Sequence, residues 1–349
     1  MTDWFFVPAQ APDEDFRIQA AAHQNQLTKP PGSLGRLEAS AIALSAMQAT
    51  ATQRVDDALI VIFAGDHGIA ARGVSAFPQA VTAEMVRNFA RGGAAISVLA
   101  KLHGARFEVV NCGTVSVIEP LEGVRDCRVA AGTRDFSREA AMSESQLRAA
   151  LNIGRDVIAR AIVSSKPDIF IAGDMGIANT SSAAALAALL LNEDAAALTG
   201  PGTGVSGDAL ASKRRIIADA VMRYRDICTN SFDVLRSVGG FEIAAMTGAY
   251  IHAAQQHIPV LIDGYIATAA ALAARALNPS CAQWFIASHQ SAEPAHGRML
   301  DALGLKALLQ LDMRLGEGSG AAVALPLLKS ACALHASMAT FASAGVSGG

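Results

Sequence analysis

Short apolar runs that end in Gly or Asp recur along the chain, and each is followed by a pattern typical of a helix. The runs occupy residues 58–68 (ALIVIFAGDHG), 106–113 (RFEVVNCG), 167–176 (PDIFIAGDMG), 259–264 (PVLIDG) and 283–288 (QWFIAS). Continuous Val, Ile, Leu and Phe runs of this length indicate strands buried on both faces, as in a parallel sheet. Alternation of such strands with helices predicts a doubly wound, Rossmann-like α/β domain.

The composition fits a protein with a large core. Of the 349 residues, 52% are hydrophobic and only 17% are charged. The net charge of -3 provides no electrostatic footprint for nucleic acid, and no basic cluster marks a membrane surface. The five cysteines are scattered and form no CxxC pair, so neither a disulfide framework nor a zinc site is predicted.

The ends of the chain indicate location and domain organisation. The first 15 residues lack a basic segment followed by an apolar one, so they do not resemble a signal peptide. Apolar stretches such as residues 183–192 are too short to span a bilayer, and we expect a cytoplasmic protein without a membrane partner. Residues 31–294 are predicted to form the large α/β domain. Residues 1–30 and 295–349 are predicted to form a small helical domain.

Polar residues follow several of the predicted strands. In an open parallel sheet the carboxyl ends of the strands meet at the ligand-binding edge, so these side chains are expected to share one pocket. The residues are Asp66, His67, Asp174, Met175, Gly176, Asn179, Thr180, Asp263, His289, Ser291 and Glu293. Several of them also have a simpler interpretation. The histidines could be core residues with a fixed tautomer, and the aspartates could cap helices or loops. Met175, like Phe77 and Met85, could be a core residue.

A glycine-rich segment at residues 199–215 (TGPGTGVSGDALASKRR) could bind phosphate. Gly200, Gly202 and Gly204 allow backbone N–H groups to approach an anion, and a helix is predicted to begin near Asp208. Lys213 or Arg214 could add a cation. The alternative is a flexible surface loop with a solvated basic cluster. The segment lacks P-loop spacing, and no GxGxxG directly follows a strand, which disfavours a dinucleotide dehydrogenase.

A lone acid, Glu317, lies between two glycines in MRLGEGSGAA, residues 313–322. The glycines allow unusual dihedral angles and close approach of a ligand, and a following helix would favour the ionised carboxylate. Such a carboxylate can act as a general base. The alternative is that Glu317 only caps the helix that begins near Ser319.

Eight motifs in order resemble one known family. They are LTKPPGSLGRLE, AGDHGIAARGVSAFPQAVTAEMV, GDMGIANTSSAAAL, GPGTGV, LRSVGGFEIAAMTGA, DGYIATAAALAA, ASHQSAEPAH and MRLGEGSGAAVAL, and they cover residues 27 to about 328. In these the chain resembles nicotinate-nucleotide–dimethylbenzimidazole phosphoribosyltransferases. The resemblance implies a Rossmann-like parallel sheet, a small helical domain made from both termini, and a homodimer. It also implies transfer of phosphoribose from nicotinate mononucleotide to 5,6-dimethylbenzimidazole, without a cofactor or metal, in cobalamin lower-ligand synthesis.

The resemblance assigns roles position by position. Glu317 takes the role of general base, and Asp174 is a second catalytic acid. Phosphate and ribose are implied to meet Gly176, Asn179, Thr180, Gly202, Thr203, Gly204 and Lys213. The nicotinate carboxylate would lie near Ser291, and Asp263 adds a further substrate-binding acid. The base would be bound by Phe77, Met85 and Leu315, with Met175 nearby, since apolar and thioether contacts suit a flat aromatic ring.

Two positions depart from the family pattern. Asp174 stands where the family usually has the longer Glu, and Ala295 stands where Gly is common; Phe77 also lies at a variable position. Two other functions stay open: a related phosphoribosyltransferase acting on another azole, a purine or a phenol, and a nucleotide-binding sensor without activity. An intact Glu317 motif argues against the sensor.

Overall fold

A computed structural model of the chain describes residues 3–202 and 204–347, so Thr203, one of the predicted phosphate contacts, lies outside the described residues. Within that part of the chain, six parallel strands form one sheet in the order β3-β2-β1-β4-β5-β6. The strands are β1 (Ala58–Gly65), β2 (Arg106–Gly113), β3 (Val124–Asp126), β4 (Ile169–Met175), β5 (Val260–Ile262) and β6 (Phe285–Ala287). The predicted doubly wound α/β fold is confirmed. The short edge strand β3 was not predicted.

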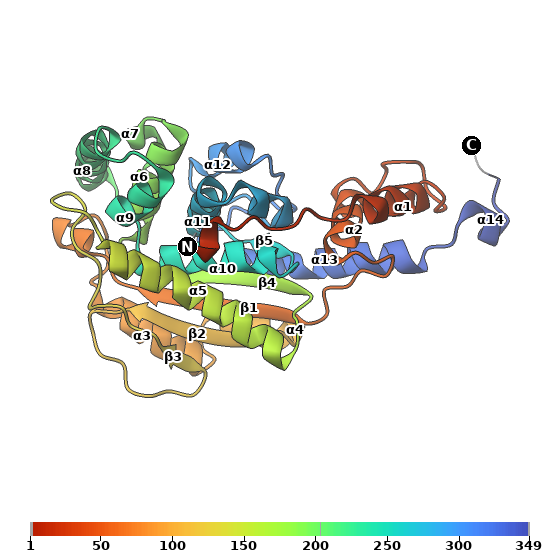
Figure 1. Ribbon diagram of the computed structural model, residues 1–349, viewed down its shortest axis with the longest axis horizontal. Coiled ribbons are helices and arrows are strands. Elements are labelled where there is room, and N and C mark those ends of the chain that lie inside the picture. Colours follow the sequence, from red (N-terminus) through yellow and green to blue (C-terminus); the bar gives the residue numbers. More distant parts are fainter. Residues whose placement is uncertain (1–2, 203, 348–349) are drawn as a thin grey trace.

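Helices form a layer on each face of this sheet. Connections between parallel strands are right-handed, so the β1-to-β2 and β3-to-β4 connections, which run in opposite directions along the sheet, place their helices on opposite faces. The first connection supplies α3 (Ala80–Ala90) and α4 (Ala95–His103), and α13 (Ser319–Ser337) packs beside α4 and β4. The other face carries α5 (Glu144–Ser164), α10 (Phe241–Gln255) and α11 (Tyr265–Leu277) (Figure 1).

Local sequence explains where several of these helices begin and end. A capping box begins α5, because the Ser143 hydroxyl accepts the N–H of Gln146 while the Gln146 side chain accepts the N–H of Ser143. The helical segment around residues 80–103 shows how a helix ends. It divides into α3 and α4 at Gly92, whose φ is +79°. This left-handed conformation favours glycine and ends an α-helix.

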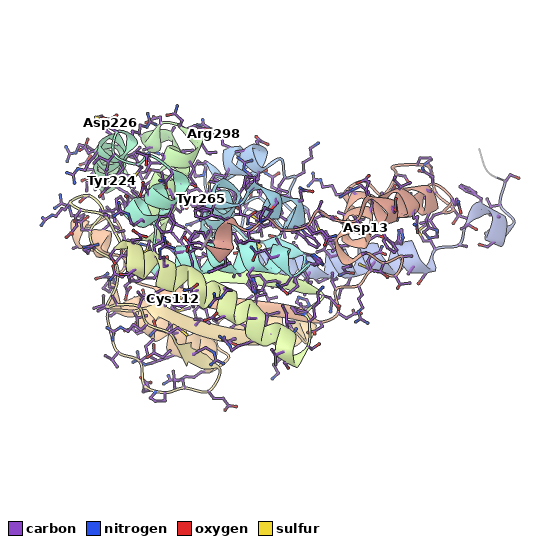
Figure 2. The ribbon with its side chains drawn as sticks, in the orientation of Figure 1. Asp13, Cys112, Tyr224, Asp226, Tyr265 and Arg298 are labelled. Atoms are coloured by element: carbon purple, nitrogen blue, oxygen red, sulfur yellow. The ribbon has the colours of Figure 1, made fainter. Side chains whose placement is uncertain are left out.

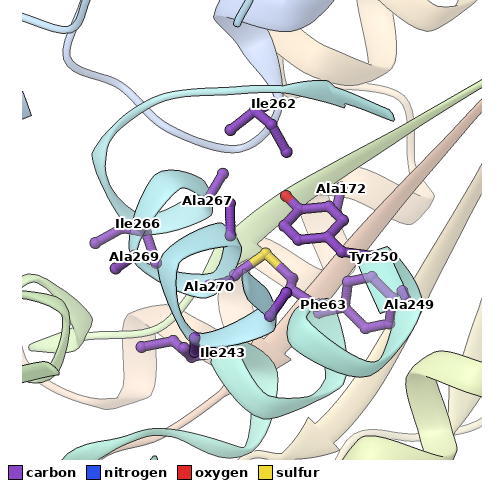
Figure 3. Packing of buried hydrophobic residues seen from close by; sticks show 14 of the residues in the cluster. Phe63, Ala172, Ile243, Ala249, Tyr250, Ile262, Ile266, Ala267, Ala269 and Ala270 are labelled. Carbon is purple, nitrogen blue, oxygen red and sulfur yellow. The ribbon is translucent and has the colours of Figure 1, made fainter. Parts of the chain in front are cut away.

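One core covers both faces of the sheet, and its largest helical contribution comes from the α10–α11 layer. Small residues on α11 and α10 let these helices approach β1 and β4 closely, and Tyr250 packs among Phe63, Ala172 and Ile262 (Figure 3). The strands β1 and β4 are buried along their whole length. Such rigid central strands hold the residues at their carboxyl ends in fixed positions.

The remaining helices form two groups beyond this core. One group covers the end of the sheet that carries the strand carboxyl termini, and comprises α6 (Asn179–Leu191), α7 (Ala195–Leu198), α8 (Gly207–Arg225), α9 (Ser231–Val238) and α12 (His296–Leu303). The other extends from the opposite side as an arm of α1 (Glu14–Gln24), α2 (Arg36–Gln48), the end of α13, and α14 (Phe341–Ala344) (Figure 1). Short 3-10 helices span Trp4–Phe6, Gly68–Arg72 and Pro279–Trp284.

The contacts of these groups bear on the predicted domains, whose boundaries stay a prediction. In the arm, α2 packs with α1 and α13, although residues 36–48 fall inside the predicted large domain. Trp4 instead packs on the main body, where its indole N–H donates to Asn152 at 2.8 Å. The helix α12 packs against α11 of the main body.

Among the described residues, α13 is the one helix long and apolar enough to cross a membrane by length and composition. The expectation that the apolar stretches are too short to do so overlooked it. In the structure, 56% of its most apolar window is buried within the protein. This burial is typical of a core helix.

Candidate active site

A cavity of about 280 Å³ opens at the carboxyl ends of β4, β5 and β6, and Phe77 from the loop after β1 also lines it. Doubly wound sheets bind ligands at this edge, beside the switch point where the strand order reverses between β1 and β4. The lining residues come from six separate stretches of the chain: Phe77, Asp174, Asn179, Thr180, Gly202, Gly264, Tyr265, Ile266, His289, Ser291, Glu293, Arg314, Leu315 and Gly316. Figure 2 shows Tyr265 inside the main body of the protein, away from the arm that carries Asp13.

Two acids lie together beside this cavity. Asp174 ends β4 and lines the cavity, and one of its oxygens accepts the side-chain N–H of Asn179 at 2.9 Å. Glu317 is buried in the loop directly after the lining residues Leu315 and Gly316. Burial, with Asp263 nearby, raises the pKa of Asp174 to about 8. The same two causes raise the pKa of Glu317 to about 7.

The backbone at Glu317 is unusual for a residue with a side chain. Its φ is +61°, and the flanking Gly316 and Gly318 also have left-handed values of +78° and +75°. Such conformations cost about 1 kcal/mol or more for a residue with a Cβ and cluster at functional sites. Gly173 packs against this loop so closely that a Cβ there would lie 2.6 Å from the carbonyl oxygen of Glu317. Gly173, the first glycine of GDMG, therefore leaves the space that the backbone of Glu317 occupies.

Asp263 holds the other side of the same loop. Its carboxylate, at the end of β5, accepts the N–H groups of Gly318 at 3.0 Å and Ala321 at 2.8 Å. Asp263 thus caps the N-terminus of α13 from a distant part of the chain. The N-cap residue of this helix, Gly318, has no side chain that could do so. The alternative interpretation of Glu317 as the helix cap is wrong. Asp263 itself is fully buried and lies behind the cavity wall rather than in it.

A buried cation marks one corner of the cavity. The Lys213 ammonium donates to the Thr180 hydroxyl at 3.0 Å, and a Cβ on Gly202 would lie 3.0 Å from the Lys213 nitrogen. Burial lowers the pKa of Lys213 to about 8, so most of its charge is retained at neutral pH. Here α8, whose start near Asp208 was predicted, brings Lys213 to the glycine-rich loop and to the first turn of α6. Backbone amides, a hydroxyl and an ammonium together suit an anion such as phosphate.

The opposite side of the cavity is apolar and open. Phe77 and Leu315 line it, with 51% and 56% of their surfaces exposed. Exposure of two large apolar side chains at a cavity mouth favours an aromatic or apolar ligand. Met85 is half-buried on α3 and packs on the core, outside the lining. Met175 is buried at the end of β4.

The structure brings together some predicted residues and not others. The cavity is lined by Asp174, Phe77, Asn179, Thr180, Gly202, Ser291 and Leu315, and Glu317 and Lys213 adjoin it. Gly176 instead packs under the site, since a Cβ there would lie 2.4 Å from the carbonyl oxygen of Gly65. Gly204 has a φ of +111° and lies outside the lining.

Sequence reasoning missed several site residues. Tyr265, Ile266 and Arg314 line the cavity, and each lies inside a motif that had been quoted, DGYIATAAALAA or MRLGEGSGAAVAL, without a role of its own. Glu242 lies below the site, where its carboxylate meets the ring nitrogen of His67 at 2.6 Å, with both side chains buried. Its place in the first turn of a helix after two glycines was the available signal. Among the described residues, no group of three or more His, Cys, Asp or Glu side chains is arranged to hold a metal ion.

A doubly wound fold with a buried ammonium and two buried acids beside one cavity suits the class of enzymes that transfer a group of a phosphorylated nucleotide. Comparisons with known proteins show which family within this class the chain resembles. A family model described as phosphoribosyltransferase matches residues 9–346. A nicotinate-nucleotide–dimethylbenzimidazole phosphoribosyltransferase of Xanthomonas oryzae is 53% identical over 345 residues, which are 99% of each chain. The enzyme of the same name from Pseudomonas aeruginosa is 50% identical, over 99% of this chain and 98% of its own.

A solved structure supports the same family. The crystal structure of the enzyme of this name from Thermus thermophilus superimposes with a TM-score of 0.91 at 39% identity, and the match covers 97% of this chain and all of the other. The chain therefore belongs to the nicotinate-nucleotide–dimethylbenzimidazole phosphoribosyltransferase family, and the resemblance inferred from the eight motifs is confirmed.

Proposed function

We propose that this enzyme transfers phosphoribose from nicotinate mononucleotide to 5,6-dimethylbenzimidazole, giving α-ribazole 5′-phosphate and nicotinate. Family membership supports the choice of substrates. The observation that carries the chemistry is that Asp174 and Glu317, two buried acids with pKa values raised to about 8 and about 7, adjoin one cavity with the buried ammonium of Lys213. This cavity combines an anion site with a proton acceptor that is partly ionised at neutral pH.

The chemistry needs one proton acceptor. A ring nitrogen of the benzimidazole attacks C1′ with its lone pair. The bond between C1′ and the nicotinate nitrogen breaks, and its electron pair neutralises the pyridinium charge, so the leaving group requires no acid. The second ring nitrogen of the base gives its proton to the Glu317 carboxylate as positive charge develops. Attack opposite the leaving group inverts C1′ and converts a β-nucleotide into an α-nucleotide.

The site geometry suggests how each substrate lies. The phosphate would occupy the corner made by Thr180, Lys213 and the glycine-rich loop that includes Thr203. The nicotinate carboxylate would meet Ser291, and the ribose would lie over Asn179 and Asp174. The base would enter between Phe77 and Leu315, where stacking and apolar contact suit a flat ring.

Asp174 has a supporting role in this proposal. At neutral pH its raised pKa leaves it largely protonated, so it can donate a hydrogen bond while Glu317 accepts the proton. Two neighbouring acids cannot both ionise at low cost, and the acid with the lower pKa, Glu317, is the one that ionises first. Asp174 is also one methylene shorter than the usual Glu, so its carboxyl group stays closer to the end of β4.

We propose further that the enzyme works in the cytoplasm, in synthesis of the lower ligand of cobalamin, and as a homodimer. Exposed apolar side chains on the arm, Ile18 on α1 and Val346 after α14, support burial against a second copy. Light scattering of the purified protein would test this. A monomer mass across the working concentration range would contradict it.

The central test is release of nicotinate from nicotinate mononucleotide with and without 5,6-dimethylbenzimidazole, together with the anomeric configuration of the product. Release that requires the benzimidazole and gives the α-anomer is expected. Equal release without an acceptor would indicate hydrolysis and contradict transfer. A faster reaction with another azole, a purine or a phenol would indicate the related transferase, which the open position of Phe77 also allows. No release with any acceptor would favour the sensor.

A further inference from the structure

The anion corner contains an acid that would oppose phosphate binding. Glu293 lines the cavity and is only 7% exposed. Its carboxylate lies against the glycine-rich loop, because a Cβ on Gly200 would come within 2.0 Å of its Oε2 atom. The backbone N–H of Gly202, a group that a bound phosphate would use, lies close enough to favour the ionised form of Glu293 and so lowers its pKa. A negative charge is therefore built into the place where the glycine-rich loop would bind an anion.

The charges that face Glu293 come from several elements. Lys213 on α8 and Arg314 in the loop before α13 attract it and favour its ionised form. The buried Tyr265 of α11, which donates its hydroxyl proton to the Leu198 carbonyl at 2.8 Å, lies within its electrostatic influence. His289 and Asp174 line the same cavity. An ionised Glu293 would therefore offset part of the positive charge that Lys213 and Arg314 bring to the corner.

Glu293 is held where it is. Its N–H donates to the Ser291 hydroxyl at 3.3 Å, and its carbonyl accepts the N–H of His296 at the start of α12. The side chain packs on Gly200, and little of it reaches solvent. A phosphate dianion entering this corner would thus meet a carboxylate that cannot easily move away.

We propose that Glu293 is a proton-coupled stand-in for phosphate: it holds the Gly202 amide as a carboxylate when the corner is free, and takes up a proton from solvent when the phosphate of the nucleotide binds. The protonated acid then donates its O–H to a phosphate oxygen, so a repulsion becomes a hydrogen bond. Burial already raises the pKa of this acid, and a neighbouring dianion raises it further. The inference rests on the proposed function only in taking the anion to be a nucleotide phosphate.

Sulfate is the best probe because, unlike phosphate, it does not itself titrate near neutral pH. Calorimetric titration of the full-length protein with sulfate, in two buffers of different ionisation enthalpy at pH 6.5, gives the number of protons taken up. Lys213, with a pKa of about 8, is already charged at this pH and contributes little. Uptake of a proton with sulfate is expected in the wild type. Binding without uptake, or no binding, would overturn the proposal.

The variant Glu293→Gln assigns the proton. Glutamine can still accept the Gly202 N–H but carries no charge, so sulfate affinity at pH 7.5 should rise about tenfold or more, and proton uptake should disappear. Glu293→Asp should keep the pH dependence, and the exposed Glu122→Gln should change nothing. Weaker sulfate binding in Glu293→Gln would show that the carboxylate supports the site instead. Should the glutamine variant not fold, proton uptake that persists in Glu317→Gln decides, because Glu317, with a pKa of about 7, is the other acid at this cavity that changes charge near this pH.

Kinetics with two substrates, the nucleotide and its riboside, test whether the anion that Glu293 meets is the phosphate of the nucleotide. The KM for nicotinate mononucleotide should fall in Glu293→Gln at pH 7.5, whereas the KM for the riboside that lacks phosphate should stay unchanged. An equal change for both would contradict the proposal. Failure of the proposed function would look different: no acceptor-dependent nicotinate release at all, with sulfate binding and proton uptake intact.

Discussion

The Asp263 carboxylate accepts the backbone N–H of Gly318 at 3.0 Å and so connects the end of β5 to the loop that carries Glu317. The same carboxylate accepts the N–H of Ala321 in the first turn of α13. A buried acid that serves two orphan amides holds the loop in its left-handed conformation and fixes the position of Glu317. This contact explains how an acid between two glycines can have a defined position.

Replacing Asp263 should therefore affect catalysis through Glu317. Asp263→Asn keeps one acceptor but turns an NH₂ group toward a backbone N–H. We expect a loss of about 1–3 kcal/mol in the free energy of unfolding and a drop in kcat larger than any rise in the KM for nicotinate mononucleotide. Urea denaturation and steady-state kinetics check both. A rise in KM alone would indicate that Asp263 binds substrate directly.

Glu317→Gln removes the proposed base while keeping the shape of the loop. Benzimidazole-dependent nicotinate release should fall about 10²–10⁴-fold, which is the usual contribution of a general base. The exposed Glu122→Gln is the matched control and should keep wild-type kinetics. Unchanged release in Glu317→Gln would move the base role to Asp174 or His67.

The pH profile should report the same acid. Glu317 must be ionised to accept a proton, and its pKa is raised to about 7. In the wild type, kcat should therefore fall about tenfold for each pH unit below that value, and decline again above about pH 8 as Asp174 loses its proton. Stopped assays of nicotinate release between pH 5 and 9 would show the low-pH limb. Persistence of the limb in Glu317→Gln would assign it to another group.

Asp174 should cost the protein stability at high pH. Burial raises its pKa from 3.8 to about 8, so the folded chain holds a proton that the unfolded chain has released between these values. The free energy of unfolding thus falls as pH rises through this window, and the full cost is present above it. Asp174→Asn should be more stable than wild type at pH 8, on the order of a few kcal/mol, and similar near pH 4.

Urea denaturation at pH 4 and pH 8 measures that difference. The Asn179 contact survives in Asp174→Asn, because the amide oxygen can still accept the same N–H. Asp219→Asn, on the exposed side of α8, is the control and should show no such pH dependence. A variant less stable than wild type at pH 8 would mean that the carboxylate is held ionised by its surroundings.

Lys213→Met should separate binding of the phosphate from the chemical step. Methionine fills the same buried channel without the charge, so the KM for nicotinate mononucleotide should rise about 10- to 100-fold, as for loss of a buried charge-assisted contact. The KM for the benzimidazole should change little. The exposed Lys101→Met on α4 is the control. An unchanged KM for the nucleotide would place the phosphate elsewhere.

The sequence alone determined the fold class and most of the residues around the cavity. Continuous apolar runs predicted β1, β2 and β4. A strand buried on both faces has an apolar run in its own sequence, so it can be recognised without knowing which residues pack against it. The positions of Asp174, Asn179 and Ser291 followed from their places at or after the ends of β4 and β6. The three-residue β3, with one half-buried and two exposed residues, left no such pattern.

Only the tertiary structure decided what each polar residue touches. Asp263 and Asp174 both lie at strand ends, but their contacts differ. Asp263 accepts hydrogen bonds from backbone amides at the start of α13, whereas Asp174 lines the cavity. Glu293 and Lys213 lie 80 residues apart and share one corner because α8 and the loop before α12 meet above the sheet. A side chain's charge and hydrogen bonds depend on neighbours from distant parts of the chain, and local sequence does not contain that information.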